Sequence, residues 1–269
     1  MTATQLATAG AAAEMLLRED AGGVATLTLN RPDQYNALSV ALLTALQSAV
    51  RDLARDASVR VVVIAGAGKA FCAGHDLKEI RERADPEFAQ EAFERCQAVM
   101  TGLTQLPQPV IARVHGPAYA AGCQLVAQCD LAVAVTEARF ATSGVNFGIF
   151  CSTPGVPLAR NVSRKRAMEM LLTGEPIDAA TALAWGLVNR VVPADRLDAE
   201  VQALARSILG KSRAVIAAGK KVFYQQVGDD LDRAYRVATA AMVECIKTED
   251  GQEGIAAFVE KRKPRWKHK

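Results

Sequence analysis

The sequence predicts an α/β fold, and three features indicate it. Apolar runs of strand length recur in the first half of the chain, helical stretches separate them, and the C-terminal part contains helical stretches alone. The chain has 269 residues, of which 50% are hydrophobic and 23% charged, so it fits one large soluble domain or a domain with an appendage. Strands that alternate with helical spacers are typical of an α/β protein.

Four stretches are expected to be strands. Residues 23–30 alternate and are β-branched, and the others are short apolar runs at 59–66, 109–116 and 131–135. The helical stretches are residues 39–56, 86–103 and a helix from about 122. In the first of these, apolar residues form one stripe at helical spacing, and Ser39 is placed to cap the helix.

The chain is expected to divide into three parts. Residues 1–13 are rich in Ala and Thr and are expected to be a disordered tail, and residues 14–194 form the core. Residues 195–269 contain four helical stretches and no strand, which indicates a helical lobe that packs on the core or on a neighbouring subunit. Residues 144–155, rich in Gly and small polar residues, are expected to be a loop.

Composition gives no sign of several classes of partner. The net charge of +3 does not favour nucleic acid, and no apolar run approaches the roughly 20 residues of a membrane span. The six cysteines show no CxxC spacing and no companion histidine cluster, so no metal site is expected. Free cysteines among apolar residues, with no secretory signal at the start, favour a cytoplasmic setting.

Two bends rich in small residues are candidate functional segments. "FCAGHDL" (71–77) follows an expected buried strand, and "YAAGCQLVA" (119–127) leads into an expected helix. The first N–H groups of a helix have no internal partner, so one N–H from each bend could converge on the oxygen of a thioester. From the residues alone, His75 could equally be a surface histidine bonded to Asp76, and the small residues could serve tight helix packing.

The C-terminal "EKRKPRWKHK" (260–269) is strongly basic. A solvated charged end is one interpretation, and a phosphate partner, from a nucleic acid or a nucleotide-bearing ligand, is the other. Trp266 alone is weak evidence for base stacking.

Six segments together resemble one family, the enoyl-CoA hydratase/isomerase (crotonase) superfamily. They are "LNRPDQYNALS", "KAFCAGHDLKEI", "HGPAYAAGCQLVAQCDLAVA", "RFATSGVNFGIF", "MLLTGEPIDAATALAWGLVNRVVP" and "EGIAAFVEKRKPRW". They occur in the family's order and cover about residues 14–267. The runs "GHDLKE", "AAGCQLVA", "FCSTPGV" and "GQEGI" are similar to one subgroup rather than to the hydratases proper.

The resemblance implies a fold, a ligand and an assembly. The fold is a spiral of repeated strand-strand-helix units with a C-terminal helical lobe used in trimer formation, and trimers commonly pair into hexamers. The ligand is an acyl-CoA thioester, with coenzyme A as part of the substrate and no separate cofactor. No nucleic acid or membrane partner is implied.

The resemblance also implies which residues form the site. The oxyanion-hole N–H groups are those of His75 and of Ala121, where the family usually has Gly. Ala37 would contact the CoA moiety through its backbone, and Ala73 and Asp76 are assigned to the same substrate-binding region.

The expected nucleotide end of the site lies in the C-terminal lobe. Phe258 and Lys261 match positions that lie near the adenine nucleotide, often that of a neighbouring subunit. In this interpretation the basic tail has a phosphate partner.

The sequence departs from the hydratases at both carboxylates that add water to the double bond. Gln124 and Gly144 occupy their positions. Gln can orient a water but accepts no proton at neutral pH, and Gly144 is expected to offer only space. General acid/base assistance contributes about 10²–10⁴-fold, so hydration is expected to be slow unless His75 or Ser152 replaces the missing groups.

We therefore expect an enoyl-CoA hydratase-like enzyme of the lyase class in which Gln124 holds the ligand rather than reacts. Isomerase or thioesterase-like activity is an alternative within the family. A catalytically weak or inactive acyl-CoA-binding regulator is a second hypothesis, and a nucleic-acid-binding relative is a third.

Overall fold

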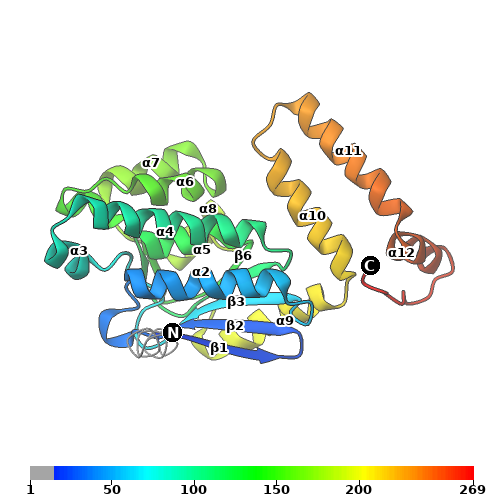
Figure 1. Ribbon diagram of the computed structural model, residues 1–269, viewed down its shortest axis with the longest axis horizontal. Coiled ribbons are helices and arrows are strands. Elements are labelled where there is room, and N and C mark those ends of the chain that lie inside the picture. The colour runs from blue at the N-terminus through cyan, green and yellow to red at the C-terminus, as the bar shows by residue number, and fades with distance from the viewer. Residues whose placement is uncertain (1–14) are drawn as a thin grey trace, which may run out of the picture.

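A six-stranded sheet forms the base of the protein in this computed structural model, which describes residues 15–269 (Figure 1). Its order is β1-β2-β3-β4-β6-β9, and only the β1–β2 pair is antiparallel. The strands are β1 (Leu16–Ala21), β2 (Val24–Leu29), β3 (Val61–Gly66), β4 (Val110–Val114), β6 (Leu131–Val135) and β9 (Arg190–Val192). The four expected strands are thus present, and the expected disordered tail at 1–13 lies outside the described residues.

A second, three-stranded sheet lies beside the carboxyl ends of the first. It consists of β5 (Ala118–Tyr119), β7 (Arg139–Ala141) and β8 (Ile177–Asp178). A parallel bridge between Cys72 and Ala118 connects it to the segment that follows β3. This connection places the two small-residue bends next to each other.

Helices cover the large sheet on the side that Figure 1 shows at the top. They are α2 (Val40–Arg55), α3 (Leu77–Arg83), α4 (Pro86–Gln105), α5 (Ala121–Gln128), α6 (Ser152–Asn161), α7 (Arg164–Thr173) and α8 (Ala179–Trp185). The chain also forms the 3-10 turns η1 (Pro32–Gln34), η2 (Ser143–Phe147) and η3 (Ala194–Arg196). The expected cap of α2 is confirmed, because the Ser39 hydroxyl accepts from the amide of Leu42 at 3.2 Å. Leu42, Leu46 and Leu53 of this helix are at most 1% exposed.

The expected loop at 144–155 is wrong in part. Gly144 lies within η2, and Ser152 begins α6. Pro and Gly in "STPGVPLARN" suggested a loop, but Pro154 near the helix start lacks only an N–H that would be unpaired there. Leu158 and Pro157 are buried in the body, so tertiary packing outweighs the weak helix propensity.

The C-terminal stretches are all helical: α9 (Leu197–Leu209), α10 (Arg213–Gln226), α11 (Leu231–Lys247) and α12 (Glu249–Val259). Helix α9 packs on the large sheet, and its Leu197, Val201 and Ala205 belong to the core. Helices α10–α12 extend away from the body as an arm (Figure 1). Because α9 packs with the core, we propose a boundary near residue 210, and the expected boundary at 195 stays a prediction.

One buried cluster fastens this arm to the body. The Lys220 ammonium of α10 donates to the Asp130 carboxylate at 2.6 Å and to the carbonyls of Leu103 and Gln108 at 2.9 Å each. Tyr224, one turn further along α10, donates to the same carboxylate at 2.8 Å. Asp130 lies two residues after the last residue of α5, so the arm is anchored close to the end of the helix that begins at the second bend.

Candidate active site

The two bends are in backbone contact, and glycine is what permits it. Gly74 has φ 103°, and a Cβ built on it would lie 2.9 Å from the Ala120 Cβ and 3.2 Å from the Ala121 nitrogen. A Cβ on Gly122 would lie only 2.0 Å from the Cys72 carbonyl oxygen. The small residues thus do allow tight packing, and what they bring together is the backbone of one bend and the first turn of α5.

The N–H groups of His75 and Ala121 remain without backbone partners. In the bridge beside the first bend, the Leu38 amide donates to the Gly74 carbonyl at 2.7 Å and the Asp76 amide donates back to Leu38 at 3.2 Å. This pattern skips the His75 amide. Ala121 is the first residue of α5, so its amide has no carbonyl one turn earlier to bond. Among residues 15–269, neither amide donates to another backbone group.

The start of α5 is held in an unusual conformation. Ala120, the residue before the helix, has φ 47° and ψ −116°, which is rare and costly for a residue with a side chain. Its amide donates to the Ala141 carbonyl at 2.8 Å, and this bond to β7 helps to hold it. Ala121 itself has no positive φ, so its N–H is oriented as that of an ordinary first helical residue.

The first bend rests on Asn36, which the sequence reasoning did not single out. Asn36 is fully buried, and its amide nitrogen donates to the carbonyls of Ala67 and Ala70 at 2.8 Å each. Its side-chain oxygen accepts from the Arg31 amide at 2.9 Å. A buried Asn with φ 57° is the type of residue that supports an irregular turn.

Asp76 is engaged in holding the same bend. Its carboxylate caps α3 by accepting from the Glu79 amide at 3.3 Å, and it pairs with Arg31 at 2.9 Å. Both side chains of this pair are largely buried. Asp76 therefore acts as a positioning residue, and its assignment to direct CoA contact stays a prediction.

Ala73 and Ala37 lie close to the bend, with different exposure. Ala73 is exposed, and its amide donates to the Tyr35 carbonyl at 3.0 Å. The amide of Ala37 donates to Gln34 at 3.0 Å, and its carbonyl accepts from Arg31 and Ser39. The backbone groups of Ala37 are thus already paired, so its CoA contact stays a prediction that now favours the methyl group.

The His75 imidazole is a neutral, unpaired ring. Both ring nitrogens are buried without a hydrogen-bond partner, and the ring packs edge-on against Phe93 of α4 at 4.7 Å. Burial lowers the pKa of His75 to about 4. The surface interpretation, in which His75 bonds Asp76, is wrong, and at neutral pH the ring is a weak base with almost no protonated form.

Gln124 lies one turn into α5 and is 5% exposed. Its side-chain oxygen is buried without a partner, and so is the hydroxyl of Thr142, which is fully buried at the end of β7. An unpaired buried acceptor costs free energy unless a ligand or water donates to it. The Gln124 oxygen is therefore available to a ligand, which accords with a holding role.

Gly144 does not offer the space that the sequence suggested. A Cβ at this position would lie 2.3 Å from the Ile149 carbonyl oxygen and 2.8 Å from the Cys151 sulfur. The Gly144 amide donates to that sulfur at 3.3 Å. Glycine is required here because the chain folds back on itself within η2 and the turn after it, so the second hydratase position is closed to any side chain.

Ser152 lacks the features of an activated nucleophile or base. It is exposed at the start of α6, and its hydroxyl donates to the Phe150 carbonyl at 3.4 Å. Among the described residues, no acidic or basic side chain forms a hydrogen bond with it. Its catalytic role stays a prediction with little geometric support.

Phe258 and Lys261 lie in the arm, away from the bends. Phe258 is 85% exposed near the end of α12, and Lys261 follows in the turn with φ 54°. Helix α12 packs on α10 and α11, and Figure 1 shows it at the far end of the molecule from α5. Within one chain these residues do not join the site, as expected if they serve a neighbouring subunit.

Residues 15–269 show neither a metal centre nor a membrane-spanning helix. No group of three or more His, Cys, Asp or Glu side chains there is arranged to hold a metal ion. Within the same range no helix has the length and apolarity needed to cross a membrane.

Comparison of the sequence with known protein families identifies the class of this protein, and the fold and the site agree with it. Residues 19–269 match the family described as enoyl-CoA hydratase/isomerase, and the chain belongs to that family. Among curated relatives, enoyl-CoA hydratase domain-containing protein 3, mitochondrial, of Mus musculus is 48% identical over 91% of this chain and 82% of its own length. The same-named protein of Homo sapiens is 49% identical, over 91% and 81%.

Solved structures support the fold assignment. An enoyl-CoA hydratase of Mycobacterium smegmatis superposes with a TM-score of 0.92 at 55% identity, covering 94% of this chain and 98% of that one. Human enoyl-CoA hydratase domain-containing protein 3 superposes with a TM-score of 0.91 at 47% identity, covering 94% and 100%. The crotonase-type fold implied by the sequence is confirmed.

The cytoplasmic prediction is corrected by the same comparison. The curated relatives from mouse, human and Xenopus laevis are named mitochondrial. The prediction rested on free cysteines, and these are compatible with any reducing compartment, so they never distinguished the cytoplasm from another one.

Proposed function

We propose that this protein is an acyl-CoA enzyme that stabilises the enolate of a thioester with the amides of His75 and Ala121, and that it lacks an efficient water-adding pair. The observation that carries this proposal is the contact between the bends, where Gly74 brings the unpaired amide of Ala121 beside that of His75. Two convergent amides suit an oxygen that gains negative charge.

The proposed reaction begins with the thioester carbonyl oxygen accepting from both amides. When a proton leaves the α-carbon, or a nucleophile adds to the β-carbon, electron density moves onto this oxygen. The start of α5 adds the positive end of its dipole at the same place. Removing one such donor typically lowers kcat about 10²–10³-fold.

Efficient hydration is not expected, because none of the four candidate residues is an effective general acid or base at neutral pH. Gln124 has an amide, Gly144 is closed to a side chain, and Ser152 has no activating partner. The low pKa of His75 leaves it neutral and weakly basic. Isomerisation also needs a group that moves a proton on the activated thioester, and among these four residues the neutral His75 ring is the strongest base.

A second candidate function is an acyl-CoA binder with little or no turnover. The closed position at Gly144 favours it, because the fold there excludes the second carboxylate altogether. The binder and the enzyme share the oxyanion contacts, so they differ only in proton transfer.

The test follows the conjugated enoyl-thioester absorbance of crotonyl-CoA and of longer enoyl-CoAs with purified protein. A slow loss of absorbance, from hydration or from conversion to a non-conjugated isomer, would support the enzyme. The rate of this loss should be lower still in His75→Ala. Bound ligand with no spectral change above background would favour the binder. Absence of any acyl-CoA binding would sink both.

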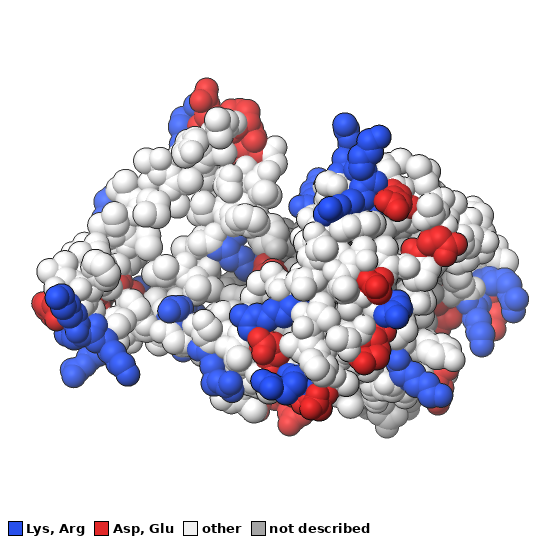
Figure 2. All heavy atoms as spheres, turned by 180° about the vertical axis from the view of Figure 1, so that it is seen from behind, with Lys and Arg blue, Asp and Glu red and all other residues white. Residues whose placement is uncertain are grey.

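We also propose that the arm mediates assembly, with a homotrimer as the unit. Large apolar side chains are exposed along it, among them Phe223, Leu231, Tyr235 and Met242 at 53%, 72%, 67% and 63%. Figure 2 shows the arm with its charged side chains mostly at its two ends and a hollow between arm and body. Large apolar side chains exposed together on one segment in this way indicate a protein interface.

Sedimentation equilibrium tests the assembly. The wild type is expected at a multiple of three chains, whereas the double variant Tyr235→Asp, Met242→Asp is expected to be a monomer that remains folded. A wild-type monomer would contradict the proposal and would leave Phe258 and Lys261 without a site.

A further inference from the structure

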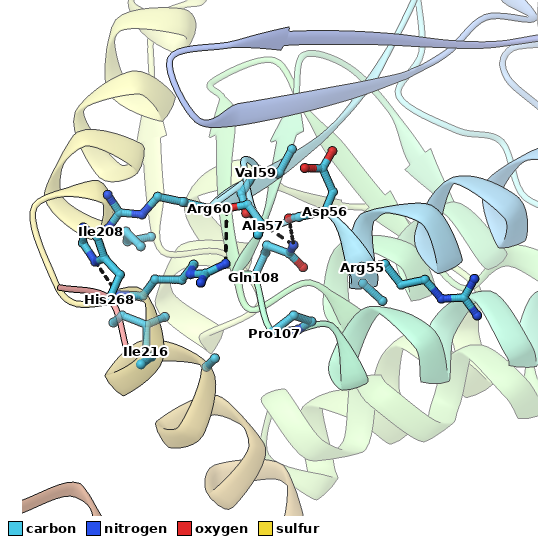
Figure 3. A pocket seen from close by; sticks show the side chains of 14 residues that line it. Arg55, Asp56, Ala57, Val59, Arg60, Pro107, Gln108, Ile208, Ile216 and His268 are labelled. Atoms are coloured by element: carbon cyan, nitrogen blue, oxygen red, sulfur yellow. Dashed lines mark hydrogen bonds between the residues drawn. The ribbon is translucent and has the colours of Figure 1, made fainter. Parts of the chain in front are cut away.

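A pocket of about 260 Å³ lies at the junction of body and arm (Figure 3). Its walls come from the end of α2, the segment before β3, the turn before β4, the end of α9, the start of α10 and the C-terminal tail. Residues 57–60 precede the first residue of β3, whereas the 71–77 bend follows its last. The pocket therefore lies at the N-terminal end of strand β3, and the candidate active site lies beyond its C-terminal end.

Positive groups gather around this pocket without carboxylate partners. Arg60 and Arg213 line it, and among the described residues neither forms an ion pair. The Arg60 guanidinium donates to the Lys211 carbonyl at 2.6 Å, and that of Arg213 to the Ala57 carbonyl at 3.2 Å. Burial and the nearby Arg213 charge lower the pKa of Arg60, as expected for cations that lack a counter-ion.

The remaining ionisable groups do not neutralise them. Asp56 lines the pocket, but its carboxylate pairs with Arg18 at 2.8 Å and accepts from the Ser58 hydroxyl at 2.6 Å. Arg55 also lines the pocket, but Figure 3 shows its side chain pointing away from the other lining residues. The His268 ring accepts from the Arg213 amide at 3.2 Å. The first turn of α10 also contributes the positive end of a helix dipole.

Two buried polar atoms on the walls lack hydrogen-bond partners, and one is an acceptor whereas the other is a donor. Gln108 is 4% exposed, and its amide nitrogen donates to the carbonyls of Leu53, Asp56 and Val59, which fixes its orientation. Its side-chain oxygen is left without a donor. The Nε of Arg60 is buried and left without an acceptor. A ligand that satisfies both must carry an acceptor and an O–H or N–H donor.

We propose that this pocket binds a small oxyanion that carries a hydroxyl, such as a phosphate with a P–OH group or a hydroxycarboxylate. The anionic oxygens accept from Arg213 and Arg60, whose planar guanidinium groups suit phosphate and carboxylate, and the hydroxyl donates to the Gln108 oxygen. The volume fits a small anion rather than a nucleotide or an acyl-CoA. Because the walls belong to both body and arm, the bound anion stabilises their junction.

The test uses calorimetric titration of the full chain with matched anions. Inorganic phosphate, which carries a P–OH near neutral pH, is compared with sulfate, which has none, and malate is compared with succinate, which lacks the hydroxyl. Each titration is repeated with saturating coenzyme A. We expect the hydroxyl-bearing anion of at least one pair to bind several-fold more tightly than its partner, with no competition from coenzyme A. The preferred pair then distinguishes a phosphate from a hydroxycarboxylate.

Variants locate the binding. Arg213→Gln is expected to weaken the preferred anion about tenfold or more, and Arg213→Lys, which keeps the charge and loses the planar fork, less than that. Arg164→Gln removes an exposed arginine at the start of α7 and is expected to change nothing. The proposal is overturned if no anion binds, if coenzyme A displaces it, if each pair binds equally, or if both Arg213 variants bind like the wild type.

Discussion

The two ends of helix α5 are built in opposite ways. At its start, the amide of Ala121 and the neighbouring amide of His75 have no backbone partner. Just beyond its end, the Asp130 carboxylate is saturated, accepting from the Val110 amide at 2.7 Å as well as from Lys220 and Tyr224. The same short helix thus presents unpaired donors to the proposed ligand site and a closed cluster to the arm. Unsatisfied polar groups indicate where a ligand belongs, and satisfied ones indicate where the structure is held.

The saturated end gives the largest expected effect. Asp130→Ala leaves Lys220, whose side chain is 7% exposed, as a buried charge without its partner. Breaking a buried pair in this way costs about 3–5 kcal/mol, so the free energy of unfolding in urea should fall by that amount. The matched control is Asp198→Ala, because the Asp198 side chain is 77% exposed and that of its partner Arg113 is 26% exposed. This change should cost less than about 1 kcal/mol. Equal losses in the two variants would show that the cluster does not anchor the arm.

The second largest expected effect is on activity, and it comes from Gln124 in the middle of α5. Gln124→Glu restores one of the two hydratase carboxylates on a backbone that already positions it. Hydration of crotonyl-CoA should rise about 10²-fold, the lower end of what a general acid or base contributes. Gln128→Glu, one turn further along α5, serves as the control and should leave the rate unchanged. A Gln124→Glu rate at the wild-type level would mean that this residue does not face the acyl group.

Adding Gly144→Glu to that variant should give no further gain. The new Cβ would meet the Ile149 carbonyl at 2.3 Å, so the turn must shift before the carboxylate can enter the site. The rate of the double variant should equal or fall below that of Gln124→Glu, with a lower melting temperature. A large further gain in the double variant would show that this turn moves readily.

The smallest expected effect is that of pH on the free energy of unfolding, and it comes from His75 beside the start of α5. The pKa of His75 is lowered from 6.5 to about 4, so between these values the unfolded chain binds a proton that the folded chain does not. Stability is therefore lost as the pH falls. Between pH 7 and pH 5 this group costs the wild type up to about 2 kcal/mol. Urea midpoints should fall less over this range in His75→Gln, and the same fall in both proteins would mean that the ring is not buried in solution.

The sequence predicted most of the regular structure because its hydrophobic periodicity is strong. Strand β1 was not expected, since five of its six residues are exposed and it lies at the sheet edge, so its pattern shows no alternation. Helix α6 was not expected because its Pro and Gly residues suggested a loop. Both depend on tertiary contacts that no local pattern encodes.

The candidate site was predicted in part, through the resemblance. The two bends, and the importance of small residues in them, could be read from "CAGH" and "AAGC". The closed space at Gly144 could not, because it depends on the carbonyl of Ile149 across a turn. Nor could the burial of the His75 ring against Phe93, since these residues lie on different elements.

The most direct test of the oxyanion hole is the infrared stretch of a carbonyl-labelled acyl-CoA thioester bound to the protein, because it needs no turnover. Two amide donors should lower the stretching frequency relative to the free thioester. The shift should be lost in Gly74→Ala, where the Cβ covers the Ala121 amide, and retained in Gly22→Ala, where φ is also positive but the space is open. A bound thioester with an unshifted carbonyl in the wild type would contradict the account.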